Sequence, residues 1–128
     1  MEQKLIMIVE DCEMMRKFLK IYCEKLGKVI TYESANEALQ SLTVKNIPDL
    51  IVSDLNLPGI NGKEFISQLR NKSISKKIPV IILTGEANVE LKLDCLSLGA
   101  VDYLSKPFHP KELQLRLKRI LGQFEPIL

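Results

Sequence analysis

Five short apolar runs recur along the chain, and each is followed by a segment whose apolar residues have helical spacing. The pattern predicts strands at residues 4–9, 29–32, 49–53, 78–83 and 101–104, and helices at 13–26, 35–42, 62–71, 86–98 and 110–124. Continuous apolar strands that alternate with amphipathic helices are typical of a parallel sheet covered on both faces through right-handed crossovers. We therefore expect a (βα)5 α/β fold, a doubly wound parallel sheet with strand order 2-1-3-4-5.

Several residues mark where the predicted helices begin and end. Ser34, with Glu37 three residues later, predicts a capping box at the start of the second helix. Gly27 is a stop signal for the first helix, and Pro110 suits the first turn of the last one. His109, the sole histidine, directly precedes that proline, and we interpret it as a loop or cap residue.

Length, net charge, apolar runs and cysteine content limit the classes of protein to which this chain can belong. A length of 128 residues suits one domain, spanning 1–128. The net charge of +2, from 18 basic and 16 acidic residues spread along the chain, gives no reason to expect nucleic-acid binding. The longest apolar runs fall far short of the about 18 residues that a membrane span needs, and the N-terminus lacks a signal-peptide pattern. Three scattered cysteines favour reduced thiols, so we expect a cytoplasmic protein without a membrane partner.

Polar side chains follow four of the five predicted strands, at the point where each strand ends. With strand order 2-1-3-4-5, the first, third, fourth and fifth strands are neighbours, so their carboxyl ends lie along one edge of the sheet. That edge, beside the point where strand order reverses, is where ligands bind in sheets of this kind. The residues expected to converge there are Glu10, Asp11, Asp54, Thr84, Glu86 and Lys106.

Three carboxylates in one place repel one another strongly, and a hard divalent cation would neutralise them. Carboxylate and carbonyl oxygens with waters suit Mg²⁺, with Mn²⁺ as an alternative ion. Lys106 adds a mobile ammonium group, and Thr84 adds a hydroxyl donor. A carboxylate in such surroundings is equipped to accept a phosphoryl group, with Asp54 as the nucleophile and the cations offsetting charge on the transferring oxygens.

Four segments carry a resemblance to a known family: "IMIVED", "LIVSDLNLPGINGKEF", "VIILTGE" and "GAVDYLSKPF". In this order and at these spacings they resemble the receiver domain of bacterial two-component response regulators, in particular stand-alone chemotaxis-type receivers. The resemblance covers essentially the whole chain, and the expected (βα)5 sheet is the flavodoxin-like arrangement of that family.

The resemblance implies a role for each residue of the acidic cluster. Asp54 matches the phosphoacceptor and Asp11 the direct metal ligand. Glu10 matches the other acidic position of the metal site, where the family often has Asp. Asn56 matches the position whose backbone carbonyl completes the metal shell.

The same resemblance implies how a phosphoryl group would be held and sensed. Thr84 and Lys106 match the two residues that contact the phosphoryl group, and Tyr103 matches the aromatic switch position. Phosphorylation would draw Thr84 toward the phosphoryl group and Tyr103 inward, which remodels the surface of the fourth helix, fifth strand and fifth helix. Asn56 and Glu86 match positions that influence phosphoryl lifetime, and we hypothesise that they orient an attacking water.

Two further features follow from the match. Gly85, after Thr84, is a small residue that should leave the phosphoryl site open, and Lys106–Pro107 is a candidate cis peptide bond. The fourth predicted helix has more apolar residues than one core-facing stripe requires, among them Val89, Leu93 and Leu96. They form either an exposed face for a partner or for self-association, or a wide buried stripe, and the sequence leaves both open.

The expected function is phosphoacceptor signalling in a two-component system or phosphorelay. A sensor histidine kinase or a histidine phosphotransfer protein would supply the phosphoryl group, and an unidentified downstream protein or a phosphorylation-dependent dimer would read it. The domain would be no enzyme beyond its own phosphoryl acceptance and autodephosphorylation.

Several alternatives remain beside this interpretation. The chain could be the N-terminal receiver of a longer regulator, or a degenerate receiver that binds partners without phosphorylation, although the intact acidic, Thr and Lys set disfavours the latter. A flavin-binding domain needs a Ser/Thr/Gly-rich loop after the first strand, where this chain has "EDCE". A hydrolase of the haloacid dehalogenase type needs a D-x-D pattern there, which is absent.

Overall fold

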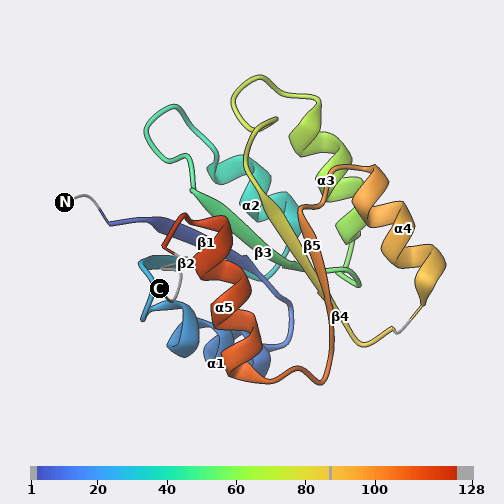
Figure 1. Cartoon of the computed structure of the whole chain (residues 1–128). Coiled ribbons are helices and arrows are strands. Elements are labelled where there is room, and N and C mark those ends of the chain that lie inside the picture. The colour runs from blue at the N-terminus through green and yellow to red at the C-terminus, as the bar shows by residue number, and fades with distance from the viewer. Residues whose placement is uncertain (1–2, 87, 124–128) are drawn as a thin grey trace.

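The structure, a computed structural model, describes residues 3–86 and 88–123. Its strands and helices alternate as β1 (Leu5–Val9), α1 (Glu13–Cys23), β2 (Lys28–Tyr32), α2 (Ala35–Ser41), β3 (Leu50–Asp54), α3 (Gly62–Arg70), β4 (Val80–Thr84), α4 (Val89–Ser97), β5 (Asp102–Ser105) and α5 (Pro110–Ile120). The strands form one parallel sheet in the order β2-β1-β3-β4-β5 (Figure 1). The predicted (βα)5 fold and strand order are confirmed.

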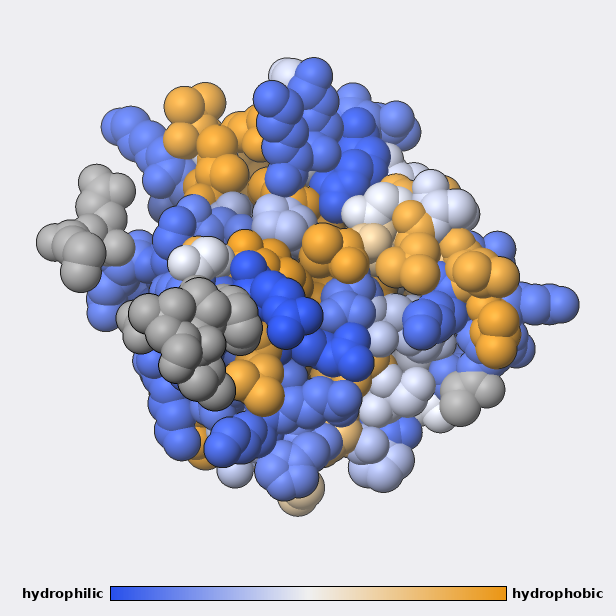
Figure 2. All heavy atoms as spheres, viewed as in Figure 1, coloured by the Kyte–Doolittle hydropathy of each residue, from blue (hydrophilic) through white to orange (hydrophobic). Residues whose placement is uncertain are grey.

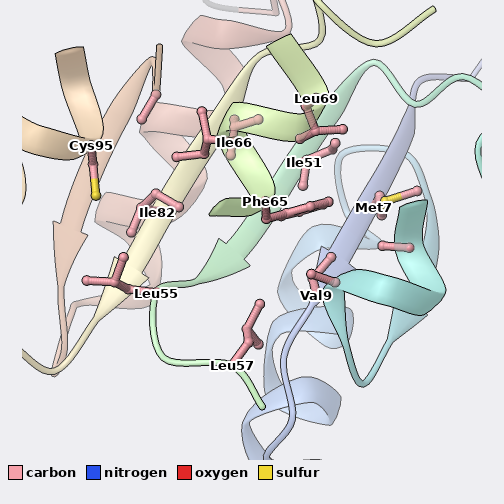
Figure 3. Packing of buried hydrophobic residues seen from close by; sticks show 14 of the residues in the cluster. Met7, Val9, Ile51, Leu55, Leu57, Phe65, Ile66, Leu69, Ile82 and Cys95 are labelled. Atoms are coloured by element: carbon pink, nitrogen blue, oxygen red, sulfur yellow. The ribbon is translucent and has the colours of Figure 1, made fainter. Parts of the chain in front are cut away.

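Helices cover both faces of the sheet, which explains why the strands are apolar throughout. Helices α1 and α5 pack on one face, and α2, α3 and α4 pack on the other (Figure 1). On the second face Phe65 of α3 is fully buried in one cluster with Met7, Val9 and Ile51 of the sheet (Figure 3). Burying one such side chain contributes roughly 1.5–3 kcal/mol. Because both faces are sealed, the ends of β1, β3 and β4 are fixed by the core.

The expected boundaries differ from the structure at several helix and strand ends. Helix α1 ends at Cys23 rather than at residue 26, and a turn follows in which the Leu26 N–H donates to the Cys23 carbonyl (2.9 Å). Helix α4 begins at Val89 rather than at residue 86, because the Asn88 side chain caps it by accepting from the N–H groups of Glu90 and Leu91. Strand β4 begins two residues later than expected, and residue 124, expected at the end of α5, lies outside the described residues.

The C-cap of α1 is Glu24, so the prediction of Gly27 as the stop of this helix is wrong, whereas the predicted N-caps of α2 and α5 have the expected residues. The Ser34 hydroxyl accepts from the Glu37 N–H (3.2 Å), and it also lies 3.4 Å from the Glu37 carboxylate. His109 is the N-cap of α5, where its Nδ1 accepts from the Lys111 N–H (3.1 Å). The interpretation of His109 as a cap residue is therefore confirmed. The Lys106–Pro107 peptide bond is cis, as expected.

Three apolar side chains of α4 are exposed among its charged residues, which decides between the two interpretations of this helix. Cys95 is its fully buried residue, whereas Val89 is 73% exposed, Leu93 59% and Leu96 36%. Figure 2 shows apolar side chains gathered over this side of the molecule. Within the described part of the chain, no helix is long and apolar enough to cross a membrane.

One prediction concerns Gly62, where α3 begins against the end of β3. A Cβ at this position would lie 2.8 Å from the Asp54 carbonyl oxygen and 2.8 Å from the Leu55 Cα, both backbone atoms. We expect Gly62→Ala to lower the free energy of unfolding by at least about 1 kcal/mol, measured by urea denaturation. Gly85→Ala is the matched control, because no atom lies within 4 Å of the added methyl group, and its change should stay below about 0.5 kcal/mol. Equal losses in the two variants would contradict this packing.

A second prediction concerns the three cysteines, which are all free thiols. Burial raises the pKa of Cys23 to about 12 and also raises the pKa of Cys95, so both lack the reactive thiolate at neutral pH. Cys12 is exposed. Brief treatment of the folded protein with iodoacetamide should therefore give a single adduct by intact mass, and denatured protein should give three. Cys12→Ser should abolish the native adduct, and a second label on folded protein would show that the core is not sealed.

Candidate functional site

The ends of four neighbouring strands lie at one edge of the sheet. Val9, the last residue of β1, pairs with Ser53, so Glu10 and Asp54 follow at equivalent positions. Asp54 in turn pairs with Leu83, and Thr84 pairs with Ser105. The register therefore brings together the polar residues that the sequence pattern assigned to this edge.

Three carboxylates form the centre of this edge. Oxygen atoms of Glu10, Asp11 and Asp54, one from each residue, all lie within 4.8 Å of one another. Glu10 is almost fully buried, Asp54 is partly buried and Asp11 is exposed. The apolar runs of β1 and β3 carry the acidic residues into the edge of the core, where repulsion between like charges is weakly screened. The predicted acidic cluster is therefore present.

Lys106 supplies the counter-charge from the loop after β5. Its Nζ lies 3.0 Å from Glu10 Oε1 and 3.4 Å from Asp54 Oδ2. The backbone fixes this loop as well, since the Lys106 N–H donates to the Thr84 carbonyl. The ammonium group therefore bridges two of the three acidic residues.

Burial and pairing act on these groups in opposite directions. Burial raises the pKa of Glu10, while its hydrogen bonds with Lys106 and with the Cys12 N–H oppose that shift. Burial by itself would lower the pKa of Lys106, but the hydrogen bond to Glu10 and the charge of Asp54 outweigh it, so the pKa of Lys106 is raised. Lys106 is accordingly held in its charged form, because its interactions with the two carboxylates favour the protonated ammonium group.

Arg16 is a site residue that the sequence did not reveal. From the first turns of α1, its guanidinium donates to the Glu10 carbonyl (2.9 Å) and to the Asp11 carbonyl (3.3 Å). The same group lies 3.5 Å from a Glu33 carboxylate oxygen. Arg16 thereby fixes the backbone of both acidic residues and places a positive charge beneath them. Because it acts on carbonyl oxygens that every residue has, no side-chain motif signals it.

A second set of contacts surrounds the loop after β4 and centres on Glu86. The Glu86 N–H donates to the Thr84 hydroxyl oxygen (3.1 Å), and the Tyr103 hydroxyl donates to the Glu86 carbonyl (2.8 Å). The Asn56 side-chain amide donates to a Glu86 carboxylate oxygen (2.9 Å). Burial raises the pKa of Tyr103, which is 6% exposed. One residue thus contacts Thr84, Tyr103 and Asn56 at once.

Asn56 joins this second set to the carboxylates. Its backbone N–H donates to Asp54 Oδ1 (3.4 Å), while its side chain contacts Glu86. Thr84 and Tyr103, by contrast, bond within the loop after β4 and make no hydrogen bond to the acidic cluster among the described residues. The predicted residues therefore form two adjoining groups, with Asn56 between them.

This arrangement suits a hard divalent cation and an anionic group bound beside it. The cluster offers only oxygen ligands, and one face of it is open because Asp11 is exposed. Lys106 pairs with only two of the three acidic groups, so a divalent ion would compensate the remaining negative charge. Lys106 and the Thr84 hydroxyl are donors that an anionic ligand could use.

Comparisons with known proteins identify the family. The family model for the response regulator receiver domain matches residues 6–118. The phosphate regulon transcriptional regulatory protein PhoB of Pseudomonas aeruginosa is 34% identical over 123 residues, which cover 96% of this chain and 54% of that protein. The chain spans about half or less of the length of the curated relatives it matches.

Solved structures agree with the sequence comparison. A putative response regulator from Chloroflexus aurantiacus J-10-fl superposes with a TM-score of 0.87 at 34% identity, covering 94% of this chain and 99% of that one. The receiver domain of the sensor histidine kinase PA1611 from Pseudomonas aeruginosa PAO1 has a TM-score of 0.83 at 30% identity, with 95% and 99% covered, and it has a magnesium ion coordinated in its active site cleft. The chain belongs to the response regulator receiver domain family of two-component signalling, and its Glu10, Asp11 and Asp54 cluster matches the phosphorylation and Mg²⁺ site of that family.

Proposed function

We propose that Asp54 accepts a phosphoryl group from a phosphohistidine, carried by a sensor histidine kinase or a histidine phosphotransfer protein. The observation that carries this proposal is the position of Asp54, at the end of a buried strand, with Glu10 and Asp11 within 4.8 Å and Lys106 3.4 Å away. Rigid placement and charge compensation are the main requirements of phosphoryl transfer.

The chemistry requires little more than positioning. An Asp54 carboxylate oxygen attacks the phosphorus, the phosphorus–nitrogen bond breaks, and the donor histidine nitrogen leaves with the electron pair. Glu10, Asp11, Asp54 and the Asn56 backbone carbonyl are the candidate holders of Mg²⁺, with Mn²⁺ as the alternative ion. A bound divalent ion would offset charge on the phosphoryl oxygens.

We propose that two residues contact the transferred phosphoryl group and that a third changes its position in response. Lys106 and Thr84 would donate to the phosphoryl oxygens. Tyr103 is proposed to switch with Thr84, since both bond to Glu86 and movement of either one alters the same loop. The added negative charge would bias a two-state equilibrium of this loop and of α4.

The surface of α4, β5 and α5 is the proposed output. Exposed Val89 on α4 lines a groove together with Lys92 and Arg116. Leu93 on the same helix is also exposed. Arg116 makes two short contacts with Asp102 at 2.7 and 2.9 Å, so this face combines apolar and charged groups. A downstream protein, or a second copy in a phosphorylation-dependent dimer, is the proposed reader.

We further propose that residues 1–128 form a single receiver domain located in the cytoplasm. It would act on no substrate beyond its own phosphoryl group. The N-terminal receiver of a longer regulator is the alternative, and the mass of the native gene product distinguishes the two. A degenerate receiver that binds partners without phosphorylation is the other alternative, and the experiment on Asp54 distinguishes it.

Incubation with Mg²⁺ and acetyl phosphate, or with beryllofluoride, should give one adduct in the wild type by intact mass or fluorine NMR. Asp54→Asn should give none, because the nucleophilic carboxylate is lost while its size is kept. Asp94→Asn, in an exposed ion pair on α4, is the control and should give the wild-type adduct. An adduct that survives in Asp54→Asn would overturn the assignment.

Glu86→Ala should prolong the phosphorylated state about tenfold, because the carboxylate and Asn56 are proposed to orient the attacking water. The decay of phosphorylated protein, followed by intact mass after removal of the donor, measures the effect. Asn56→Ala should have a similar and non-additive effect, whereas Glu90→Ala should decay at the wild-type rate. An unchanged decay rate in Glu86→Ala would remove Glu86 from this role.

A further inference from the structure

The turn between β1 and α1 carries both members of the acidic pair, and most of its backbone polar groups have a partner. The Glu10 N–H donates to the Tyr32 carbonyl (3.0 Å), and the Cys12 N–H donates to Glu10 Oε2 (3.2 Å). The carbonyls of Glu10 and Asp11 both accept from Nη1 of Arg16, at 2.9 and 3.3 Å. One side chain therefore binds the peptide carbonyls on both sides of the Asp11 Cα.

The Asp11 carboxylate depends on this backbone for its position. Asp11 is exposed, and in the described part of the chain no residue forms a hydrogen bond or an ion pair with its carboxylate. Glu10, by contrast, is 1% exposed, and its own side chain bonds to Lys106 at 3.0 Å. Asp11 has only the peptide groups on either side of it to direct its carboxylate toward Asp54. Arg16, which binds those groups, therefore controls how well Asp11 is placed for a metal ion.

The charge of Arg16 would act on a metal ion in the opposite direction. A positive charge close to a cation site weakens cation binding by repulsion. Arg16 Nη2 lies 3.5 Å from a carboxylate oxygen of Glu33, but the Glu33 side chain is 68% exposed, and ion pairs this exposed contribute little. If Arg16 acted only through its charge, removing it would tighten the binding of a divalent ion. If it acts by holding the two carbonyls, removing it would weaken that binding.

We propose that Arg16 is a positioning residue, which preorganises Asp11 for the divalent ion by holding the carbonyls of Glu10 and Asp11. This inference rests on the proposed function and adds a residue of α1 that shapes the metal site without being a ligand. A ligand that is fixed before the ion arrives lowers the ordering cost of binding, and this gain outweighs the repulsion by the guanidinium. Arg16 therefore acts on the affinity for the ion and not on phosphoryl transfer to Asp54.

The first test is the Mn²⁺ affinity of the protein, measured by electron paramagnetic resonance without a phosphoryl donor. Arg16→Met keeps an apolar stem but has no donor, and it should weaken Mn²⁺ binding at least about threefold. Lys17→Met is the matched control, because it removes a charge of the same sign from the next residue of α1, where Lys17 forms an exposed ion pair with Glu13. It should change the affinity by less than about 1.5-fold. Unchanged or tighter Mn²⁺ binding in Arg16→Met would overturn the proposal.

Two further variants separate the carbonyl contacts of Arg16 from its ion pair. Glu33→Gln removes the ion pair and leaves the carbonyl contacts, so its Mn²⁺ affinity should stay within about 1.5-fold of the wild type. Arg16→Lys keeps a charged donor and should restore part of the affinity lost in Arg16→Met. The proposal is wrong if Glu33→Gln weakens binding as much as Arg16→Met does, or if Arg16→Lys binds no more tightly than Arg16→Met.

Hydrogen exchange in the metal-free protein reports on the turn itself. In Arg16→Met the Cys12 N–H should exchange at least about tenfold faster, because the backbone of its acceptor Glu10 is no longer held. Amides within β1 should keep their wild-type exchange rates, since the core is unchanged. Unchanged exchange at Cys12 would contradict the positioning role, and so would an equal acceleration throughout β1, which would indicate a loss of global stability.

The dependence of phosphorylation on Mg²⁺ separates this inference from the proposed function. With acetyl phosphate, Arg16→Met should need at least about threefold more Mg²⁺ for half-maximal phosphorylation, whereas its rate at saturating Mg²⁺ should stay within about twofold of the wild type. A lower saturating rate with an unchanged Mg²⁺ requirement would overturn only the role of Arg16. Failure of wild-type Asp54 to form an adduct would remove the proposed function, whatever the effect of Arg16→Met on Mn²⁺ affinity.

Discussion

Repulsion among three carboxylates at the end of a rigid sheet is the constraint on which this structure depends. Glu10, Asp11 and Asp54 bring oxygens within 4.8 Å of one another at the edge of an apolar core, where screening is weak. Lys106 and Arg16 offset the repulsion, one at the carboxylate oxygens and the other at the backbone carbonyls. The cluster persists because the strands that carry it cannot move apart without opening the core.

The packed core therefore determines how precisely the side chains of the site are positioned. Strands β1, β3 and β4 are buried on both faces, and residues such as Phe65 fill the space between sheet and helix (Figure 3). Gly62 lets α3 begin in contact with the carbonyl of Asp54, so the loop that follows the acidic strand is tied back to it. A flexible loop would allow the carboxylates to separate, and the cluster would be less suited to a metal ion.

Glu86 connects the residues around the acidic cluster with β5. It bonds to Thr84, Tyr103 and Asn56, so the loop after β4 is linked to β5 and, through Asn56, to Asp54. Helix α4 follows that loop, and its Val89 and Leu93 side chains are exposed among charged residues of the helix. Coupled movement of these contacts is what the proposed signalling role requires.

Periodicity in the sequence determined the alternation of strands and helices, and the polar residue after each strand determined which side chains meet at the edge of the sheet. Both are local properties, fixed by where apolar runs begin and end. The cap by Asn88 and the contact of Arg16 with the Glu10 carbonyl are local, spanning at most six positions, and the sequence analysis did not assign them. The tertiary structure decided the exposure of Leu93 and the contact of Glu10 with Lys106. That contact depends on the distance between two residues separated by 96 positions in the chain. No local pattern encodes such distances, because they are set only when the helices pack against the sheet.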